Sequence, residues 1–290
     1  MKNIFLPLAF FAAIVFFACR PEPLVIILPD EPQQVVVFSQ LIPNQVITVL
    51  LTKTISSLAF SEEEGDSLTS DFVDNLLVDS AEVMITFEGE TEELVQIAPG
   101  VYASINTPQR AGVEYLLEIT TREGDKLTSR STMLEQVGFE NATPIIKRTA
   151  DDTLVTLEYD FIDPPGDNWY MINYYRRARV DTTTFDLDNI LSSQTGIATR
   201  TILLTDKIFE NNNPSDLIEM PDVSPTDTII VSISNINEQY HQFLDLRRRS
   251  GNFLTTLTKE PISYPTNIEG GLGFFNTHFP DVELFDLNDY

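Results

Sequence analysis

The sequence has few of the side chains on which most catalytic and metal sites depend. It contains one cysteine, Cys19, and two histidines, His241 and His278. A lone cysteine has no disulfide partner within the chain, so stability must come from core burial. His-x-x-x-His, Cys-x-x-Cys and Gly-x-Ser-x-Gly patterns are missing, which excludes the common signatures of zinc sites and serine hydrolases. We therefore assign no catalytic, cofactor-binding or metal-binding residue and expect a protein that is not an enzyme.

Positive charge is also scarce. The chain has 18 Lys and Arg residues against 44 Asp and Glu residues, which gives a formal net charge of −26. A body with this charge is repelled by nucleic acid and by anionic membrane surfaces. We expect no nucleic-acid partner, and electrostatic attraction cannot hold the protein at a membrane.

The N-terminus offers another means of attachment. Residues 4–17 are almost wholly apolar, too short for a helix that spans a bilayer and typical of a signal-peptide core. The run ends in Phe16-Phe17-Ala18-Cys19, which resembles the lipobox of bacterial lipoproteins. We expect residues 1–18 to be a lipoprotein signal peptide and Cys19 to carry several acyl chains, because one chain binds a membrane only marginally. The alternative is a plain secretory signal with an incidental cysteine.

The rest of the chain reads as mainly β, in two domains. Residues 19–34 contain four prolines and form an extended tether. Residues 35–135 show about seven short apolar segments separated by turn residues, the pattern of an immunoglobulin-like β-sandwich. Within them, Gly112-Val113-Glu114-Tyr115 suits a tyrosine corner. Residues 142–290 are expected to form a second β-rich domain, a sandwich or an open barrel, and no internal repeat is apparent.

One helix is expected in the second domain, near residues 237–249. Asn235 or Asn237 can cap its N-terminus, and apolar residues recur at helical intervals from Tyr240. Residues 247–249 are all arginine, which complements the helix dipole in the last turn. Helix-end stabilisation is therefore the favoured interpretation of this triplet, and a partner-binding patch is the alternative.

The remaining polar clusters do not define a site. Glycoside hydrolysis needs only two carboxylates, and the sequence offers dozens without selecting a pair. Residues 62–66 and 186–189 supply oxygen ligands suited to calcium, but solvated surface charge explains them as well. Residues 270–273, Gly-Gly-Leu-Gly, lack the lysine of a phosphate loop and are expected to form a tight, flexible loop. Trp169 lies in a segment that reads as a strand buried on both faces.

Three segments in this order resemble a known group of proteins. They are Gly100-Val101-Tyr102 with residues 112–119, residues 161–170 around Asp163-Pro164-Pro165-Gly166, and the glycine-rich residues 265–275. The combination is similar to the Bacteroidota outer-membrane lipoproteins of the domain-of-unknown-function 4249 family. The resemblance implies residence at the outer membrane, anchored by lipid on Cys19, on either its periplasmic or its surface face. It also implies a TonB-dependent transporter as partner, and it supplies no catalytic residue.

Together these features predict a non-enzymatic lipoprotein that acts as a binding or accessory subunit of such a transporter. Its anchor would concentrate it near a membrane-embedded partner without high intrinsic affinity. Two alternatives stay open: a surface glycan hydrolase that uses two carboxylates, and a structural or adhesive envelope protein. The sequence does not identify a ligand.

Overall fold

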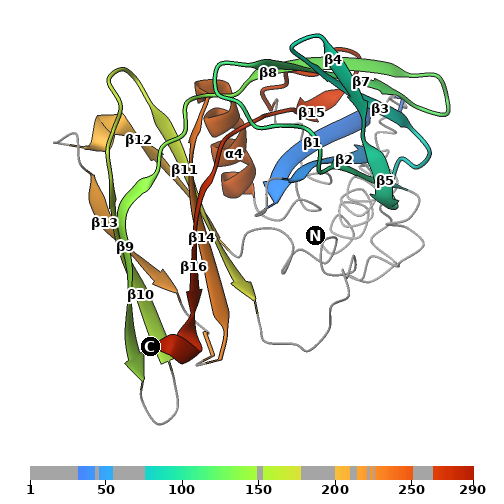
Figure 1. Cartoon of the computed structure of the whole chain (residues 1–290). Helices are drawn as coiled ribbons and strands as arrows, with labels where there is room; N and C mark the ends of the chain where they lie inside the picture. The colour runs from blue at the N-terminus through green and yellow to red at the C-terminus, as the bar shows by residue number, and fades with distance from the viewer. Residues whose placement is uncertain are drawn as a thin grey trace, which may run out of the picture. The chain divides into compact units, whose positions relative to one another are not determined.

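The computed structural model describes residues 32–42, 46–54, 76–148, 153–177, 200–209, 214–220, 223–224, 226–250 and 264–290. The chain divides into two compact units, Met1–Pro32 and Gln33–Tyr290. Every described residue except Pro32 lies in the second unit, where these residues form two β-sandwiches and helix α4 (Figure 1). The expectation of a mainly β fold is confirmed.

The first sandwich pairs a five-stranded with a four-stranded sheet. The strand orders are β15-β1-β2-β6-β5 and β4-β3-β7-β8. Strands β1 to β8 are distributed between these two sheets as in an immunoglobulin-like sandwich, and β15 is an additional strand at one edge. The strands are β1 (Val35–Ile42), β2 (Val46–Lys53), β3 (Glu82–Phe87), β4 (Glu90–Glu93), β5 (Val95–Ala98), β6 (Val101–Ser104), β7 (Glu114–Thr120), β8 (Lys126–Thr132) and β15 (Leu272–Phe274).

Alternating side chains fill the space between these sheets. On β7, Tyr115, Leu117 and Ile119 are buried in the core while the residues between them are more exposed. Strand β1 differs, because its side chains are apolar on both faces: Val37 points into the core and Phe38 packs in a separate cluster against the helix. Strands buried on both faces read as continuous apolar runs.

The tyrosine corner is present. The Tyr115 hydroxyl donates a 2.6 Å hydrogen bond to the Pro108 carbonyl and accepts one of 3.1 Å from the Arg110 amide. Gly112 takes a φ of 77°, a left-handed conformation that favours glycine. Burial raises the pKa of Tyr115, so the hydroxyl keeps its proton and the bond to Pro108.

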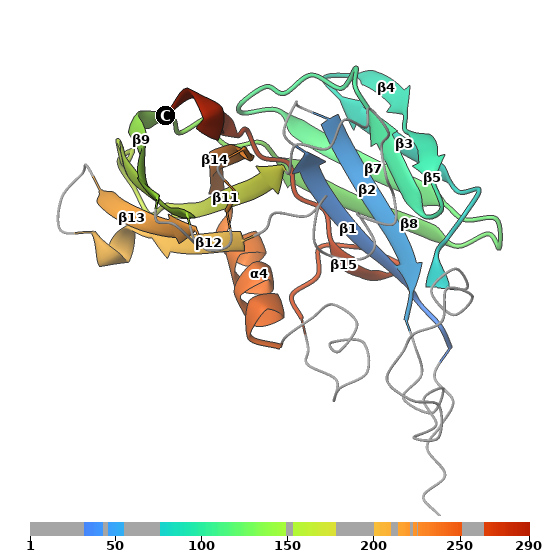
Figure 2. The same cartoon turned by 90° about the horizontal axis from the view of Figure 1, so that it is seen from below.

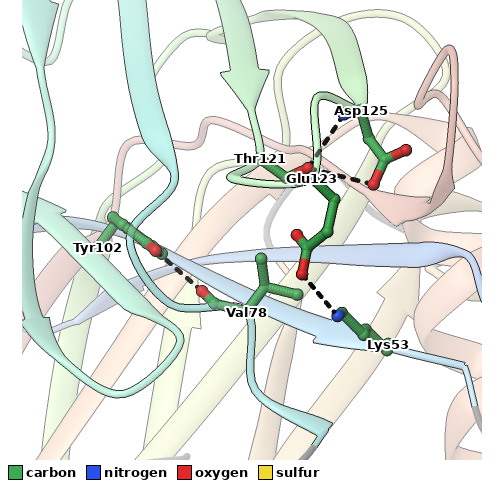
Figure 3. Close-up of polar contacts among 6 residues, drawn as sticks. All are labelled: Lys53, Val78, Tyr102, Thr121, Glu123 and Asp125. Atoms are coloured by element: carbon green, nitrogen blue, oxygen red, sulfur yellow. Dashed lines mark hydrogen bonds and ion pairs between the residues drawn. The ribbon is translucent and has the colours of Figure 1, made fainter.

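Polar contacts hold segments beside the strands of this sandwich, and one of them, the ion pair of Lys53 and Glu123, links the two sheets (Figure 3). The Tyr102 hydroxyl on β6 donates to the Val78 carbonyl at 2.8 Å. Lys53, at the end of β2, pairs with Glu123 at 3.1 Å, in the turn between β7 and β8. That turn is held by Thr121, whose hydroxyl bonds the Asp125 carboxylate at 3.1 Å.

The second sandwich repeats the chain path of the first. Its sheets have the orders β13-β10-β9 and β12-β11-β14-β16, so β9, β10 and β13 correspond to β1, β2 and β6. No counterpart of β5 lies beside β13 among the described residues. This topological repeat was missed by the sequence analysis. The strands are β9 (Phe139–Arg148), β10 (Thr153–Phe161), β11 (Trp169–Arg177), β12 (Arg200–Thr205), β13 (Ser215–Met220), β14 (Thr228–Ile236) and β16 (Asp281–Asp286), with short 3-10 helices η2 (Asp206–Ile208) and η3 (Leu287–Asp289).

Residues 264–280, between the helix and β16, return to the first sandwich, and we call them the closing segment. Its strand β15 pairs in parallel with β1, and Glu269 forms an isolated bridge with Thr128 on β8. Ser129 donates a 2.8 Å hydrogen bond to the Asn267 carbonyl, and the Thr277 amide donates one of 2.9 Å to Ser131. The segment therefore joins β1 to β8 along one side of the first sandwich, although the sequence assigned residues 142–290 to the second domain.

The glycines of the closing segment have a steric role. Gly273 has a φ of 99°, and a Cβ added there would overlap the Val37 carbonyl. A Cβ on Gly271 would overlap Leu127. The prediction of a flexible loop at residues 270–273 is wrong, because only glycine lets the backbone pass this close to β1 and β8.

Helix α4 (Glu238–Ser250) packs between the two sandwiches (Figures 1 and 2). Its Tyr240 and Phe243 form a cluster with Met171 and Ile236 of the second sandwich and Phe274 of the closing segment. The rings of Phe243 and Phe274 lie 5.5 Å apart. Large aromatic contacts of this kind favour a fixed arrangement of the two sandwiches.

A chain of hydrogen bonds runs from this helix into the closing segment. The Tyr240 amide donates to Asn237 Oδ1 at 2.7 Å, so Asn237 caps the helix and its Nδ2 must donate to Asn276 Oδ1 at 3.0 Å. Asn276 Nδ2 then faces His278 Nδ1 at 3.3 Å. Because an amide nitrogen only donates, His278 Nδ1 must accept, which requires a neutral ring. Asn235, the other candidate cap, lies in β14 instead, where its Nδ2 is 3.5 Å from Asn168 Oδ1.

Candidate partner-binding surface

The chain crosses from one sheet of the first sandwich to the other between two consecutive edge strands. Strand β4 has the sequence Glu-Thr-Glu-Glu and forms the edge of the four-stranded sheet. Leu94 follows and is buried in the core. Strand β5 then forms the edge of the five-stranded sheet with the sequence Val-Gln-Ile-Ala. Charged residues protect an edge from association with other chains, and β5 lacks them.

Three apolar side chains near β5 are unusually exposed. Val95 is 66% exposed, Ile97 is 42% exposed and Ile105, just after β6, is 78% exposed. Val95 lies opposite Ala103 in the ladder, so Ile105 comes two residues beyond that partner. Ile105 lies just outside β6, which ends at Ser104, so its place near β5 follows from the short stretch of chain that separates it from Ala103. We call Val95, Ile97 and Ile105 the β5 apolar surface.

The loop that carries Ile105 is held in place by a carboxylate of β4. Glu92 accepts hydrogen bonds from the Ser104 hydroxyl and, at 3.0 Å, from the Thr107 hydroxyl. The Ser104 hydroxyl also accepts from the Asn106 amide at 3.0 Å. These bonds fix residues 104–107, so Ile105 is presented to solvent in a preorganised conformation, which lowers the entropy lost on binding.

The backbone of β5 is less accessible than its side chains. The β5–β6 register shifts between Gln96 and Ala98, which marks a bulge. Gln96 Nε2 donates to Asp79 at 2.7 Å and to the Ala98 carbonyl at 3.2 Å. A bulge and a side chain bonded to the edge both hinder addition of another strand. The surface is therefore suited to side-chain docking rather than to strand addition.

Carboxylates are frequent on the strand that precedes β5 in the chain. Glu90 and Glu93 are exposed on β4, and Glu88 precedes them in the turn, where it pairs with Arg110. The excess of acidic groups matches the net charge of −26 of the whole chain. A complementary partner would combine apolar side chains with a basic rim.

The sequence as a whole matches a known family. The model described as Domain of unknown function (DUF4249) matches residues 21–278. The chain belongs to this family. The match spans the first sandwich, helix α4, most of the closing segment and the second sandwich except β16, so the DUF4249 domain includes parts of both sandwiches.

Other comparisons add little to this DUF4249 assignment. No curated protein matches the chain. A crystal structure of a point mutant of Salmonella alpha-2-macroglobulin is 12% identical over 74% of this chain, with a TM-score of 0.22. The chain spans only 14% of that protein's length.

Several residues singled out from the sequence lie outside the described residues. They are Cys19, residues 20–31 of the tether, and the acidic clusters at residues 62–66 and 186–189. Lipidation of Cys19 and calcium binding by the clusters therefore stay predictions. Within the described ranges, no three His, Cys, Asp or Glu side chains are grouped so that they could hold a metal ion. Every helix in these ranges is too short or too polar to span a bilayer.

The other candidates have structural partners. Arg248 and Arg249 pair with Asp245, at 2.8 and 2.6 Å, and Arg247 lies 4.3 Å from the centre of the Phe38 ring. Trp169 is partly buried, with Lys207 over its ring at 6.0 Å. His278 is buried, which lowers its pKa to about 4. The arginine triplet thus serves the helix end and the contact between the sandwiches.

Sequence analysis missed the β5 apolar surface. Strand β6 ends at Ser104, so Ile105 lies just outside the ladder. The available signal was the contrast between the consecutive segments Glu-Thr-Glu-Glu and Val-Gln-Ile. The contacts of Glu92 with Ser104 and Thr107 depend on the fold and had no local signal.

Proposed function

We propose that this DUF4249 protein is a non-enzymatic lipoprotein of the outer membrane that docks, as an accessory subunit, on a TonB-dependent transporter. The β5 apolar surface carries the proposal, because three apolar side chains at and near an edge strand are exposed and the loop that carries Ile105 is held by Glu92. Exposed apolar groups of this kind are typical of protein interaction sites.

A lipid anchor on Cys19 explains how such a small surface suffices. The β5 apolar surface is small, so its intrinsic affinity is expected to be low. Attachment to the same membrane confines both proteins to a thin layer and raises their effective concentration. The anionic body would by itself drift away from anionic lipid, so the anchor is essential.

Photo-crosslinking in living cells tests the docking surface. A photoreactive amino acid at Ile105 is expected to crosslink to a TonB-dependent barrel, identified by mass spectrometry. The same group at Leu284, 61% exposed on edge strand β16 of the second sandwich, serves as the matched control. Crosslinking at neither position, or equally at both, would contradict docking through β5.

Fractionation tests the anchor separately. Cys19→Ser should release the mature protein from the membrane fraction and remove the Ile105 crosslink, while the folded chain persists in the soluble fraction. Retention of this variant in washed membranes would contradict anchoring by lipid on Cys19.

A further inference from the structure

The second sandwich contains a cavity that the proposed function does not use. It has a volume of about 170 Å³ and lies beside β13 and β12, which are edge strands of the two sheets. Both views show these two strands side by side (Figures 1 and 2). Its lining residues are Tyr159, Phe161, Leu204, Phe209, Pro214, Ser215 and Asp216.

The lining changes from exposed and polar to buried and aromatic. Ser215 and Asp216 are exposed, whereas Tyr159 and Phe161 are 2% and 0% exposed. The cavity therefore extends from solvent to an aromatic floor. A cavity of similar size in another protein holds a benzene molecule, so this one has room for a six-carbon body.

The aromatic rings of the lining pack against one another. Tyr159 and Phe161 are stacked at 6.4 Å, and Phe209 meets Phe161 edge to face at 5.8 Å. The face of an aromatic ring carries negative charge density and attracts cations. The aromatic part of the lining thus favours a cation with an apolar body.

Asp216 adds a full negative charge at the entrance. Its Oδ1 accepts a 2.8 Å hydrogen bond from the Leu217 amide, which fixes the carboxylate. Burial, and then the charge of Asp216, raise the pKa of Tyr159, which places the carboxylate near that ring. In the part of the chain that the structure covers, no Lys or Arg side chain pairs with Asp216. This carboxylate has no compensating cation there.

We infer that this cavity binds an organic cation, an ammonium or guanidinium group on a small apolar body. The body occupies the space above Tyr159 and Phe161, and the charged group lies at the entrance beside Asp216. Such a group is available from a free amine or from the Lys or Arg side chain of a partner protein. The site is independent of the β5 apolar surface, so either proposal can fail without the other.

Ligand-observed NMR on the full chain in detergent micelles tests the site with benzylammonium and with its neutral analogue, benzyl alcohol. Benzylammonium should bind more tightly, and Asp216→Asn should weaken it about fivefold while leaving benzyl alcohol unchanged. Phe209→Leu should weaken benzylammonium as well, because a ring face is lost. Glu158→Gln, which removes the same charge from the opposite face of the sheet, is the matched control.

Equal affinity for the two probes, or an Asp216→Asn variant that binds benzylammonium like the parent protein, would overturn the inference. A third probe, Nα-acetyl-lysine amide, which keeps the charged side-chain ammonium of lysine, distinguishes the source of the cation. Binding of this probe with the same dependence on Asp216 identifies a partner's side chain as ligand, whereas binding of benzylammonium alone identifies a free amine.

Discussion

The two sandwiches follow the same chain path but differ along their sides. In the first, β6 is flanked by β5, and the closing segment joins β1 to β8 on the opposite side. In the second, β13 is an edge strand, and the cavity lies beside it. One β-sandwich plan is thus completed by added segments in the first case and bordered by a cavity in the second.

Substitution of Gly273 should reveal how much the first sandwich depends on its closing segment. Gly273→Ala places a Cβ against the Val37 carbonyl at a φ that disfavours side chains. We expect a loss of about 3 kcal/mol or more in the free energy of unfolding, measured by urea titration. Gly166→Ala, at a similarly positive φ before β11 but with open space around it, should lose only about 1–2 kcal/mol. Equal losses would mean that close packing against β1 is unimportant.

The pH dependence of stability tests the buried end of the same segment. Burial lowers the pKa of His278 from 6.5 to about 4, so the unfolded chain binds a proton that the folded chain rejects. Stability from this group is complete above pH 6.5 and falls by about 3 kcal/mol as the pH drops to 4. His278→Gln should remove this part of the slope, and His241→Gln on α4, whose pKa burial also lowers, should remove a smaller part. An unchanged slope for His278→Gln would contradict a neutral, buried ring.

The tyrosine corner is a smaller difference between the sandwiches. Tyr115→Phe removes one bond to Pro108 and one from Arg110, and should destabilise the protein by about 1–2 kcal/mol. Tyr159→Phe in the second sandwich removes a hydroxyl that makes no hydrogen bond to the other described residues, and should change stability by less than about 0.5 kcal/mol. Thermal unfolding of both variants measures the difference. If Tyr159→Phe destabilised the protein more than Tyr115→Phe, the Tyr159 hydroxyl would have to make a hydrogen bond, which would contradict this expectation.

The smallest expected effect concerns the ion pair of Lys53 and Glu123. The hydrogen bond from Lys53 lowers the pKa of Glu123, yet that carboxylate is 57% exposed. Exposed pairs of this kind contribute little to stability and are screened by salt. Glu123→Gln should therefore unfold at nearly the same urea concentration as the parent protein in low and in high salt. A clear loss of stability in Glu123→Gln at low salt alone would show that the ion pair between the sheets stabilises the fold.

Much of the fold was predictable because it depends on local patterns. Strand alternation and turn residues identified the immunoglobulin-like first domain, and Tyr115 after Gly112 identified its tyrosine corner. Helix α4 begins at Glu238, close to the residue 237 expected from its cap. These features are specified by residues that are neighbours in the sequence.

The rest depends on contacts between distant residues. Gly271 and Gly273 read as a flexible loop, because their packing against Leu127 and Val37 has no local signal. The repeat of the sandwich was hidden because topology is preserved without sequence similarity. Exposure of Ile105, and the cavity above Phe161, likewise follow only from the assembled sheets.

The closing segment has a consequence for the order in which the chain folds. Ser39 bonds to Asn276, 237 positions later, so the first sandwich is completed by residues that are synthesised after strands β9 to β14 of the second. Until then β1 and β8 lack their neighbour, and their exposed edges invite association with other chains. A chain truncated before residue 264 would therefore expose the edges of β1 and β8 in its first sandwich.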